Sequence, residues 1–287
     1  MRHAFLLCHL SLLLAVVLPT GLLARDSGRP FSLTLRRQVQ PFPAADTWTE
    51  ARFQQDFSTA KSAIIITDMW DKHWCHGATV RVGEIAQRME PLLNEARAAG
   101  VLIIHAPSDT MSYYADAPGR KLAEDAPHAA PPPELDLKNP PLPIDDSDGG
   151  CDSPDDKEHK AWSRETPLLT IAPGDVISDS GKEIYNVLHE RGINTVFFMG
   201  VHANMCILNR TFGIRQLTRW GLRCILVRDL TDAMYDSRSR PFVSHAAGTE
   251  LVIDYIEQHY APTTTSTEMM QALSSQRAAA QASGDQH

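Results

Sequence analysis

The sequence has few cysteines, few aromatic residues and no excess of positive charge. Five of its 287 residues are cysteine, 7% are aromatic, and the formal net charge is −8. A negative balance argues against a nucleic-acid partner, because phosphate binding needs a basic surface. No C-x-x-C motif is present, which disfavours a thiol–disulfide redox protein. The rest of the composition, 43% hydrophobic and 22% charged, is typical of a globular chain.

The one long apolar run stands at the N-terminus. Residues 4–18 are apolar at all but two positions, Arg2 precedes them, and small residues follow at Gly21 and Ala24. This pattern is typical of a signal peptide, here residues 1–24. The alternative is an uncleaved anchor, but the run is short for a bilayer span and no later segment is apolar enough. We therefore expect an exported chain, periplasmic or secreted, with no membrane association after cleavage.

Export affects how the cysteines are interpreted. Cys8 would leave with the signal peptide, and the four remaining cysteines permit three pairings between which sequence alone does not choose. Cys75 and Cys151 lie in polar, loop-like sequence, whereas Cys224 lies in an apolar strand pattern. If a disulfide forms, we expect Cys75 with Cys151, which leaves Cys206 free.

From residue 61 onward, short apolar runs alternate with helical patterns. The expected strands are 63–67, 101–104, 175–177, 195–199 and 223–227, and the expected helices are 82–99, 204–220 and 244–259. Buried strands separated by helices are typical of a parallel sheet covered on both faces. We therefore predict one α/β domain over residues 61–265, three-layered, doubly wound and Rossmann-like.

Three segments lie outside this alternation. Residues 25–60 are expected to form an N-terminal extension, and residues 266–287 a flexible tail after a possible edge strand at 262–265. A long insertion at about 110–165 includes Pro118–Pro154, which holds nine of the chain's 19 prolines. So many prolines predict a loop without regular structure. Its acidic residues do not match an EF-hand, so a solvated loop is favoured over a calcium site.

The chemistry is expected at the carboxyl ends of the strands, where ligands bind in open α/β sheets. Asp68 ends the first strand, and the fourth strand runs into a loop that reaches Cys206. If the strand order is 3-2-1-4-5, these two residues face each other. A helix beginning near Asn204 would lower the thiol's pKa and offer N–H groups to an oxyanion. The alternatives are a buried, inert Cys206 and a structural Asp68.

Three segments resemble the isochorismatase-like cysteine hydrolase family, which includes nicotinamidases. They are AIIITDMWDKHWCHGAT, GVHANMCI and RCILVRDLTDAM, and the resemblance spans roughly residues 62–265. It implies that Asp68 belongs to a catalytic triad, that Cys206 is the nucleophile and that Asp229 stands at a family aspartate position. It also implies a cis peptide between Val201 and His202, which together with Met205 would form the oxyanion loop.

The chain departs from the family pattern at the third triad member. The family has a lysine just after the third strand, where this chain has Asp179 and Ser180. Lys182 is close by and is the candidate replacement; the alternative is that it is an exposed residue in the first turn of a helix. Ala203 also stands where many relatives have threonine or serine.

The resemblance also bears on the pocket and on cofactors. The candidate pocket residues are Trp70, Trp74, His105 and Tyr113, with core packing as the alternative for the two tryptophans. Some nicotinamidases bind a metal near the second strand. The residues of this chain in that region are His73, His76, His105 and Asp109, whose spacing does not reproduce the metal motif. We therefore expect neither a metal nor any other cofactor.

Three functions remain open. The leading hypothesis is hydrolysis of a small amide or related C–N bond through a Cys206 thioester, with Asp68 moving the proton. The second is isochorismatase-type cleavage of a vinyl ether, which does not require the cysteine. The third is a non-catalytic exported binding protein on the same fold. The partner in each case is a small molecule, and a homo-oligomer is suggested by the resemblance alone.

Overall fold

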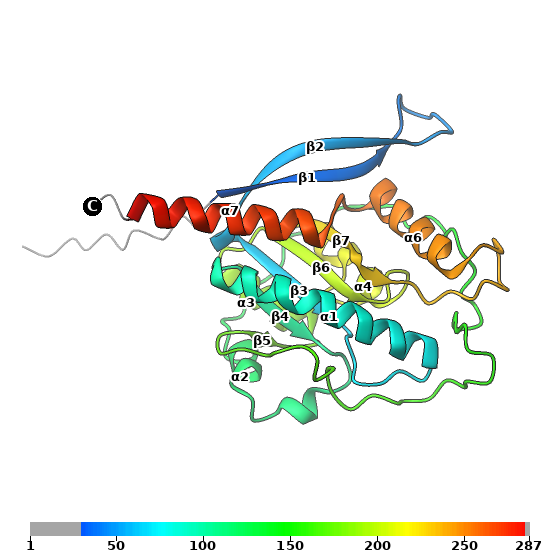
Figure 1. Cartoon of the computed structure of the whole chain (residues 1–287), viewed down its shortest axis with the longest axis horizontal. Helices are drawn as coiled ribbons and strands as arrows, with labels where there is room; N and C mark the ends of the chain where they lie inside the picture. Colours follow the sequence, from blue (N-terminus) through cyan, green and yellow to red (C-terminus); the bar gives the residue numbers. More distant parts are fainter. Residues whose placement is uncertain (1–29, 285–287) are drawn as a thin grey trace, which may run out of the picture.

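The computed structural model describes residues 30–284, so the predicted signal peptide lies outside the described residues. Eight strands form one sheet in the order β2-β1-β8-β7-β6-β3-β4-β5 (Figure 1). The neighbouring strands β8, β7, β6, β3, β4 and β5 run parallel to one another. At one edge, β1 pairs antiparallel with both β8 and β2. The predicted mostly parallel α/β architecture is confirmed.

The centre of the sheet follows the expected winding. Its strands are β3 (Ser62–Thr67), β4 (Leu102–Ala106), β5 (Val176–Ile177), β6 (Thr195–Val201) and β7 (Arg223–Asp232). Their spatial order β5-β4-β3-β6-β7 is the 3-2-1-4-5 order that the sequence analysis assumed, with β3 beside β6. All residues of β3 and β6 are buried, as expected for central strands covered on both faces. The residues that follow β3 and β6 therefore meet at one edge of the sheet.

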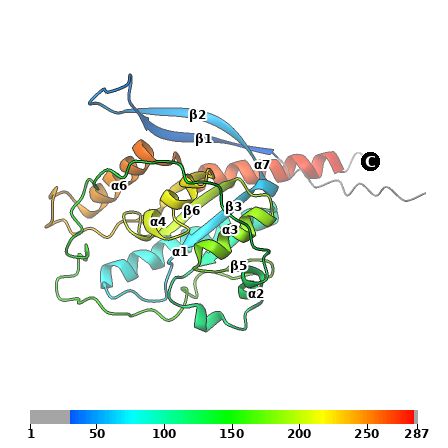
Figure 2. The same cartoon turned by 180° about the vertical axis from the view of Figure 1, so that it is seen from behind.

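Helices cover both faces of the sheet and complete the three layers. One face carries α1 (His76–Ala98) and α7 (Ser266–Gly284), which pack on each other. The other face carries α3 (Gly181–Glu190), α4 (Cys206–Asn209), α5 (Ile214–Arg219) and α6 (His245–His259) (Figure 2). The single helix predicted over 204–220 is wrong, because the chain turns between α4 and α5 at residues 210–213.

The predicted N-terminal extension contributes to the sheet. A hairpin of β1 (Pro30–Val39) and β2 (Thr49–Ser58) pairs through β1 with β8 (Thr263–Thr264), and the short helix η1 (Thr59–Lys61) leads into β3. In β1 the alternating residues Phe31, Leu33 and Leu35 are buried. Arg36 Nε also donates to the buried Glu257 of α6 at 2.7 Å. The strand predicted at 262–265 is present, but it lies inside the sheet rather than at its edge.

The prediction of a flexible C-terminal tail is wrong for residues 266–284. They form α7, whose Met269 and Leu273 are buried against α1 and the sheet. At its beginning, Asp229 of β7 accepts hydrogen bonds from the N–H (2.7 Å) and the hydroxyl (2.5 Å) of Ser266. The aspartate that the family resemblance pointed to therefore caps α7 in this structure.

The insertion is less irregular than its prolines suggested. It begins with the helical turn η2 (Met111–Tyr114) and α2 (Pro118–Glu124), where Pro118 occupies the first turn that proline tolerates. Residues 125–165 then run over the domain without a helix or a strand, apart from one bridge between Glu165 and Trp70.

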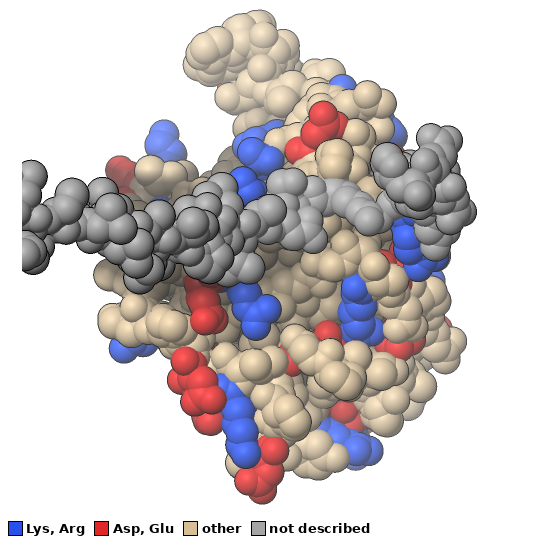
Figure 3. Space-filling model, turned by 90° about the vertical axis from the view of Figure 1, so that its left-hand side faces the viewer, with Lys and Arg blue, Asp and Glu red and all other residues tan. Residues whose placement is uncertain are grey.

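Within the described residues, none of the helices combines the length and apolarity that a bilayer span requires. Basic and acidic side chains are interspersed with uncharged ones on the face shown in Figure 3.

Candidate active site

Asp68 follows β3 and lies fully buried at the carboxyl edge of the sheet. Its backbone is left-handed, with φ of 47°, a conformation that non-glycine residues adopt mainly where the surrounding structure enforces it. The Ser108 N–H, just beyond β4, donates to Oδ1 at 2.7 Å. Burial raises the pKa of the Asp68 carboxyl, and the charge of Arg210 opposes that effect.

Cys206 follows β6 and begins α4. Its thiol faces the Asp68 carboxylate, to which it can donate a hydrogen bond, and the His202 N–H faces the sulfur. The peptide between Val201 and His202 is cis, as predicted. Gly200 lets the end of β6 lie close to β3, because a Cβ there would lie 2.1 Å from the Thr67 carbonyl oxygen. The predicted meeting of Asp68 and Cys206 is thus confirmed as a structural arrangement.

The thiol's expected low pKa is wrong. Burial raises the pKa of Cys206, and the negative charge of Asp68 raises it further, against a smaller opposing effect of Arg210. The helix that was expected to lower this pKa is a single turn, α4, so its dipole is weak. Asn204 does not cap it either; its side-chain amide bonds to Asp146 and to the backbone of Met234. The resting sulfur is therefore a thiol.

Arg210 places a cation beside Asp68. Its Nε and Nη2 lie 3.0 and 2.9 Å from Asp68 Oδ2. The Arg210 N–H bonds to the Cys206 carbonyl oxygen at 3.0 Å, so one helical turn connects the two residues. Lys182 is exposed on the first turn of α3 and is not brought to this pair. The four-residue spacing from Cys206 to Arg210 was the sequence signal that could have revealed this residue.

The predicted pocket residues have different surroundings. Trp70 is buried, with Nε1 donating to the Ser108 carbonyl oxygen at 3.0 Å, and Trp74 packs against the buried cluster that contains Cys75 of the disulfide. Tyr113 is exposed, and its hydroxyl accepts a hydrogen bond from Arg164. Trp162 of the insertion, which the sequence pattern did not single out either, stacks its ring on Trp70 with centroids 4.1 Å apart.

His105 is not a pocket residue, because it is completely buried between two carboxylates. Its Nδ1 lies 2.7 Å from Glu165 and its Nε2 lies 3.1 Å from Asp175. Burial lowers the pKa of His105, but the two carboxylates outweigh this and raise it to about 9. Arg97 also binds Asp175, which makes a buried ionic network that anchors the end of the insertion.

The His105 network predicts a pH-dependent stability. Its contribution should be fully present below pH 6.5, the ordinary pKa, and disappear as the pH rises through about 9, a difference of about 3 kcal/mol. His105→Gln should therefore cost more free energy of unfolding at pH 6 than at pH 10, measured by urea denaturation. His189→Gln, at an exposed position of α3, is the control. Equal losses for His105→Gln at both pH values would contradict this assignment.

A disulfide between Cys75 and Cys151 joins the beginning of α1 to the insertion, as predicted. Beside it, Arg81 binds Asp152 of the insertion at 2.6 Å and Asp232 of β7 at 2.8 Å. Covalent and ionic contacts thus hold the insertion close to the loop that carries Met205 and Cys206.

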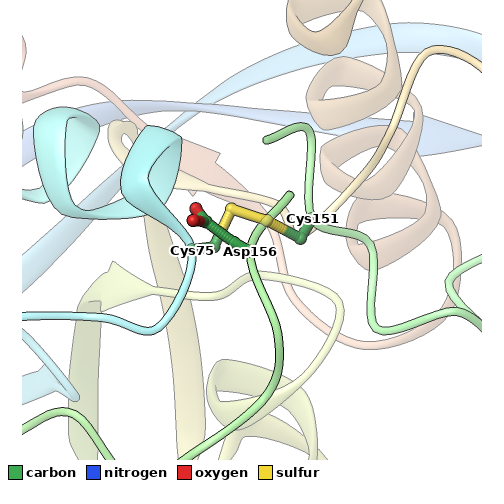
Figure 4. Close-up of side chains that lie close together, drawn as sticks. All are labelled: Cys75, Cys151 and Asp156. Carbon is green, nitrogen blue, oxygen red and sulfur yellow. A yellow bond between two sulfur atoms is a disulfide. The ribbon is translucent and has the colours of Figure 1, made fainter. Parts of the chain in front are cut away.

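The disulfide cysteines also belong to the one group of three potential metal ligands found among residues 30–284. It consists of Cys75, Cys151 and Asp156 (Figure 4). The two sulfurs are joined in the disulfide and are not thiolates, so this group does not have the chemistry of a metal site. His73 and His76 do not belong to it.

The strand order of the sheet and the helices on both of its faces are those of an isochorismatase-like fold, in which Asp68 follows β3 and Cys206 follows β6 of this chain. The structure is similar to the crystal structure of a cysteine hydrolase from Pseudomonas syringae pv. phaseolicola 1448A. The TM-score is 0.50 at 21% identity, covering 77% of this chain and 95% of that one. It is also similar to an isochorismatase from Pseudomonas putida KT2440, with a TM-score of 0.46 at 16% identity, covering 73% and 90%. No protein-family model and no curated protein matches the sequence.

Proposed function

We propose that this protein is a cysteine hydrolase that cleaves a C–N bond of a small amide through a thioester on Cys206. The observation that carries the proposal is the contact of the Cys206 thiol with a buried Asp68 carboxylate that Arg210 keeps paired. A nucleophile beside a base, with a third group orienting the base, is the arrangement that covalent catalysis needs.

The geometry supports a defined sequence of proton movements. As the Cys206 sulfur attacks the amide carbon, its proton passes to Asp68, which then gives it to the departing amine. Water then attacks the thioester carbon and Asp68 takes one of its protons. As the C–S bond breaks and the carboxylic acid leaves, Asp68 returns this proton to the sulfur, which restores the thiol and the carboxylate. Burial lowers the pKa of Arg210, but the carboxylates of Asp68 and Asp109 outweigh this and raise it, so Arg210 remains a cation and does not transfer a proton.

The oxyanion has fewer candidate donors than the sequence suggested. The Met205 N–H donates to the His202 carbonyl oxygen at 3.0 Å, and the Ala203 N–H donates to the Asp232 carbonyl oxygen at 2.7 Å. The Cys206 N–H lies at the beginning of α4, where a helix leaves its first N–H groups without helical partners. We assign it as the principal oxyanion donor.

A second candidate is a non-catalytic binding protein on the same fold. The observation that favours it is the raised pKa of Cys206, because a protonated thiol is a weak nucleophile without assistance. Vinyl-ether cleavage gains no such support, since it would leave the contact between Cys206 and Asp68 without a role.

Trapping of the intermediate tests the proposal. Wild-type protein is mixed with acetamide, benzamide or N-carbamoylglycine, ammonia release is followed, and acid-quenched samples are analysed by intact mass and peptide mapping. We expect ammonia from at least one compound and the matching acyl mass on the peptide that contains Cys206. Ammonia release with the acyl group elsewhere would refute the mechanism, and absence of ammonia with all three would favour the binding protein.

A further inference from the structure

The last residues of the insertion lie beside the residues that follow β3. The Asp71 N–H donates to the Arg164 carbonyl oxygen at 2.9 Å, and the Thr166 N–H donates to the Met69 carbonyl oxygen at 2.7 Å. These antiparallel contacts fix Trp162, just before them, close to the strand end that carries the catalytic aspartate. The insertion therefore contributes a side chain to the surroundings of the site.

Trp162 belongs to a group of nearly parallel rings. It stacks on Trp70 at an interplanar angle of 11°, and the His73 ring lies 5.9 Å from both at 19° and 27°. The His73 and His202 rings are in T-shaped contact, with centroids 5.2 Å apart. Because the His202 N–H faces the Cys206 sulfur, these four rings, here called the ring slot, adjoin the nucleophile.

Two nitrogens of the ring slot are buried without a hydrogen-bond partner among the described residues. They are Trp162 Nε1 and His202 Nε2, and His202 is only 1% exposed. Buried polar atoms are nearly always paired, so unpaired ones beside a nucleophile indicate a ligand that pairs them. Burial lowers the pKa of His73 to about 4 and that of His202 to about 3, so both rings are neutral at physiological pH.

We propose that Trp162 and His202 are specificity-determining residues that receive a flat, uncharged part of the ligand. One face of the half-buried Trp162 ring is covered by Trp70, so its other face is the stacking face for the ligand, and Trp162 Nε1–H donates to an acceptor that the ligand carries. The inference rests on the proposed function for placing the ligand's carbonyl at Cys206. It goes beyond that function because it assigns the choice of ligand to a residue of the insertion.

Equilibrium binding of acetanilide to a Cys206→Ser background tests this without requiring turnover. Calorimetry should show saturable binding that Trp162→Ala weakens by at least about tenfold. Trp162→Phe keeps a ring but removes the N–H, and should weaken binding by about threefold. Trp48→Phe, on the hairpin against His259, is the matched control and should bind as the background does. N-cyclohexylacetamide, which lacks the flat ring, should bind more weakly than acetanilide.

Failure of this inference can be distinguished from failure of the proposed function. Acetanilide binding that Trp162→Ala leaves unchanged, or no binding to the background, would overturn the ring slot as a specificity element. Either result could accompany a trapped acyl group on Cys206. If Trp162→Ala does not fold, the affinity of Trp162→Phe for acetanilide is compared with that of the background, and equal affinities would overturn the proposal.

Discussion

Replacement of Cys206 by Ala is expected to reduce amide hydrolysis by at least about a thousandfold. The variant removes the atom that forms the thioester, and Asp68 is left with no thiol whose proton it could accept. The loss should appear in kcat, because the sulfur's covalent bond is made only after the substrate has bound. Ammonia release under saturating substrate is the measurement, with the compound that wild-type protein turns over.

The chain contains its own control for this substitution. Cys224 is the other free cysteine of the described chain and lies buried in β7, away from Asp68. Cys224→Ala should keep kcat within about twofold, since it loses only a small buried side chain. Full turnover by Cys206→Ala would refute the thioester route and leave vinyl-ether-type or other direct hydrolysis as the explanation of any activity.

The parallel core was predictable because its signals are local. Each central strand is a short apolar run that ends at a polar residue, and strand order follows a common winding. The hairpin was missed although Phe31, Leu33 and Leu35 alternate with polar residues, the pattern of a half-buried strand. The last helix was missed because its composition is rich in Ala, Gln and Ser; only the spacing of Met269 and Leu273 marks its buried side.

The site was predictable as far as strand ends determine it. Asp68 and Cys206 meet because β3 and β6 are neighbours, which the assumed order implied. The state of the thiol was not predictable, since it depends on the length of α4 and on burial beside Asp68. Trp162 lies nearly a hundred residues from Trp70 in the sequence, and no periodicity connects the two rings.

Replacement of Arg210 by Leu should shift the acid limb of the kcat/KM profile to higher pH. The positive charge of Arg210 lowers the pKa of Asp68 against the effect of burial, so its removal raises that pKa further. A protonated Asp68 does not accept the thiol's proton, and activity at neutral pH should fall while part of it returns as the pH rises. Arg210→Lys retains the charge and should keep the limb near its wild-type position.

The free energy of unfolding tests the ion pair of Arg210 and Asp68 independently of activity. Arg210→Leu leaves Asp68 buried without its cation, and we expect a loss of about 3 kcal/mol in the free energy of unfolding at neutral pH. Below the ordinary pKa of 3.8, Asp68 is protonated in both the folded and the unfolded chain, so the loss should shrink there. Arg215→Leu, on the neighbouring helix α5, should leave the acid limb in place, because Arg215 bonds to Asn209 and Tyr255 instead. An unshifted limb in Arg210→Leu would show that Asp68 is not the base and that this cation has a structural role alone.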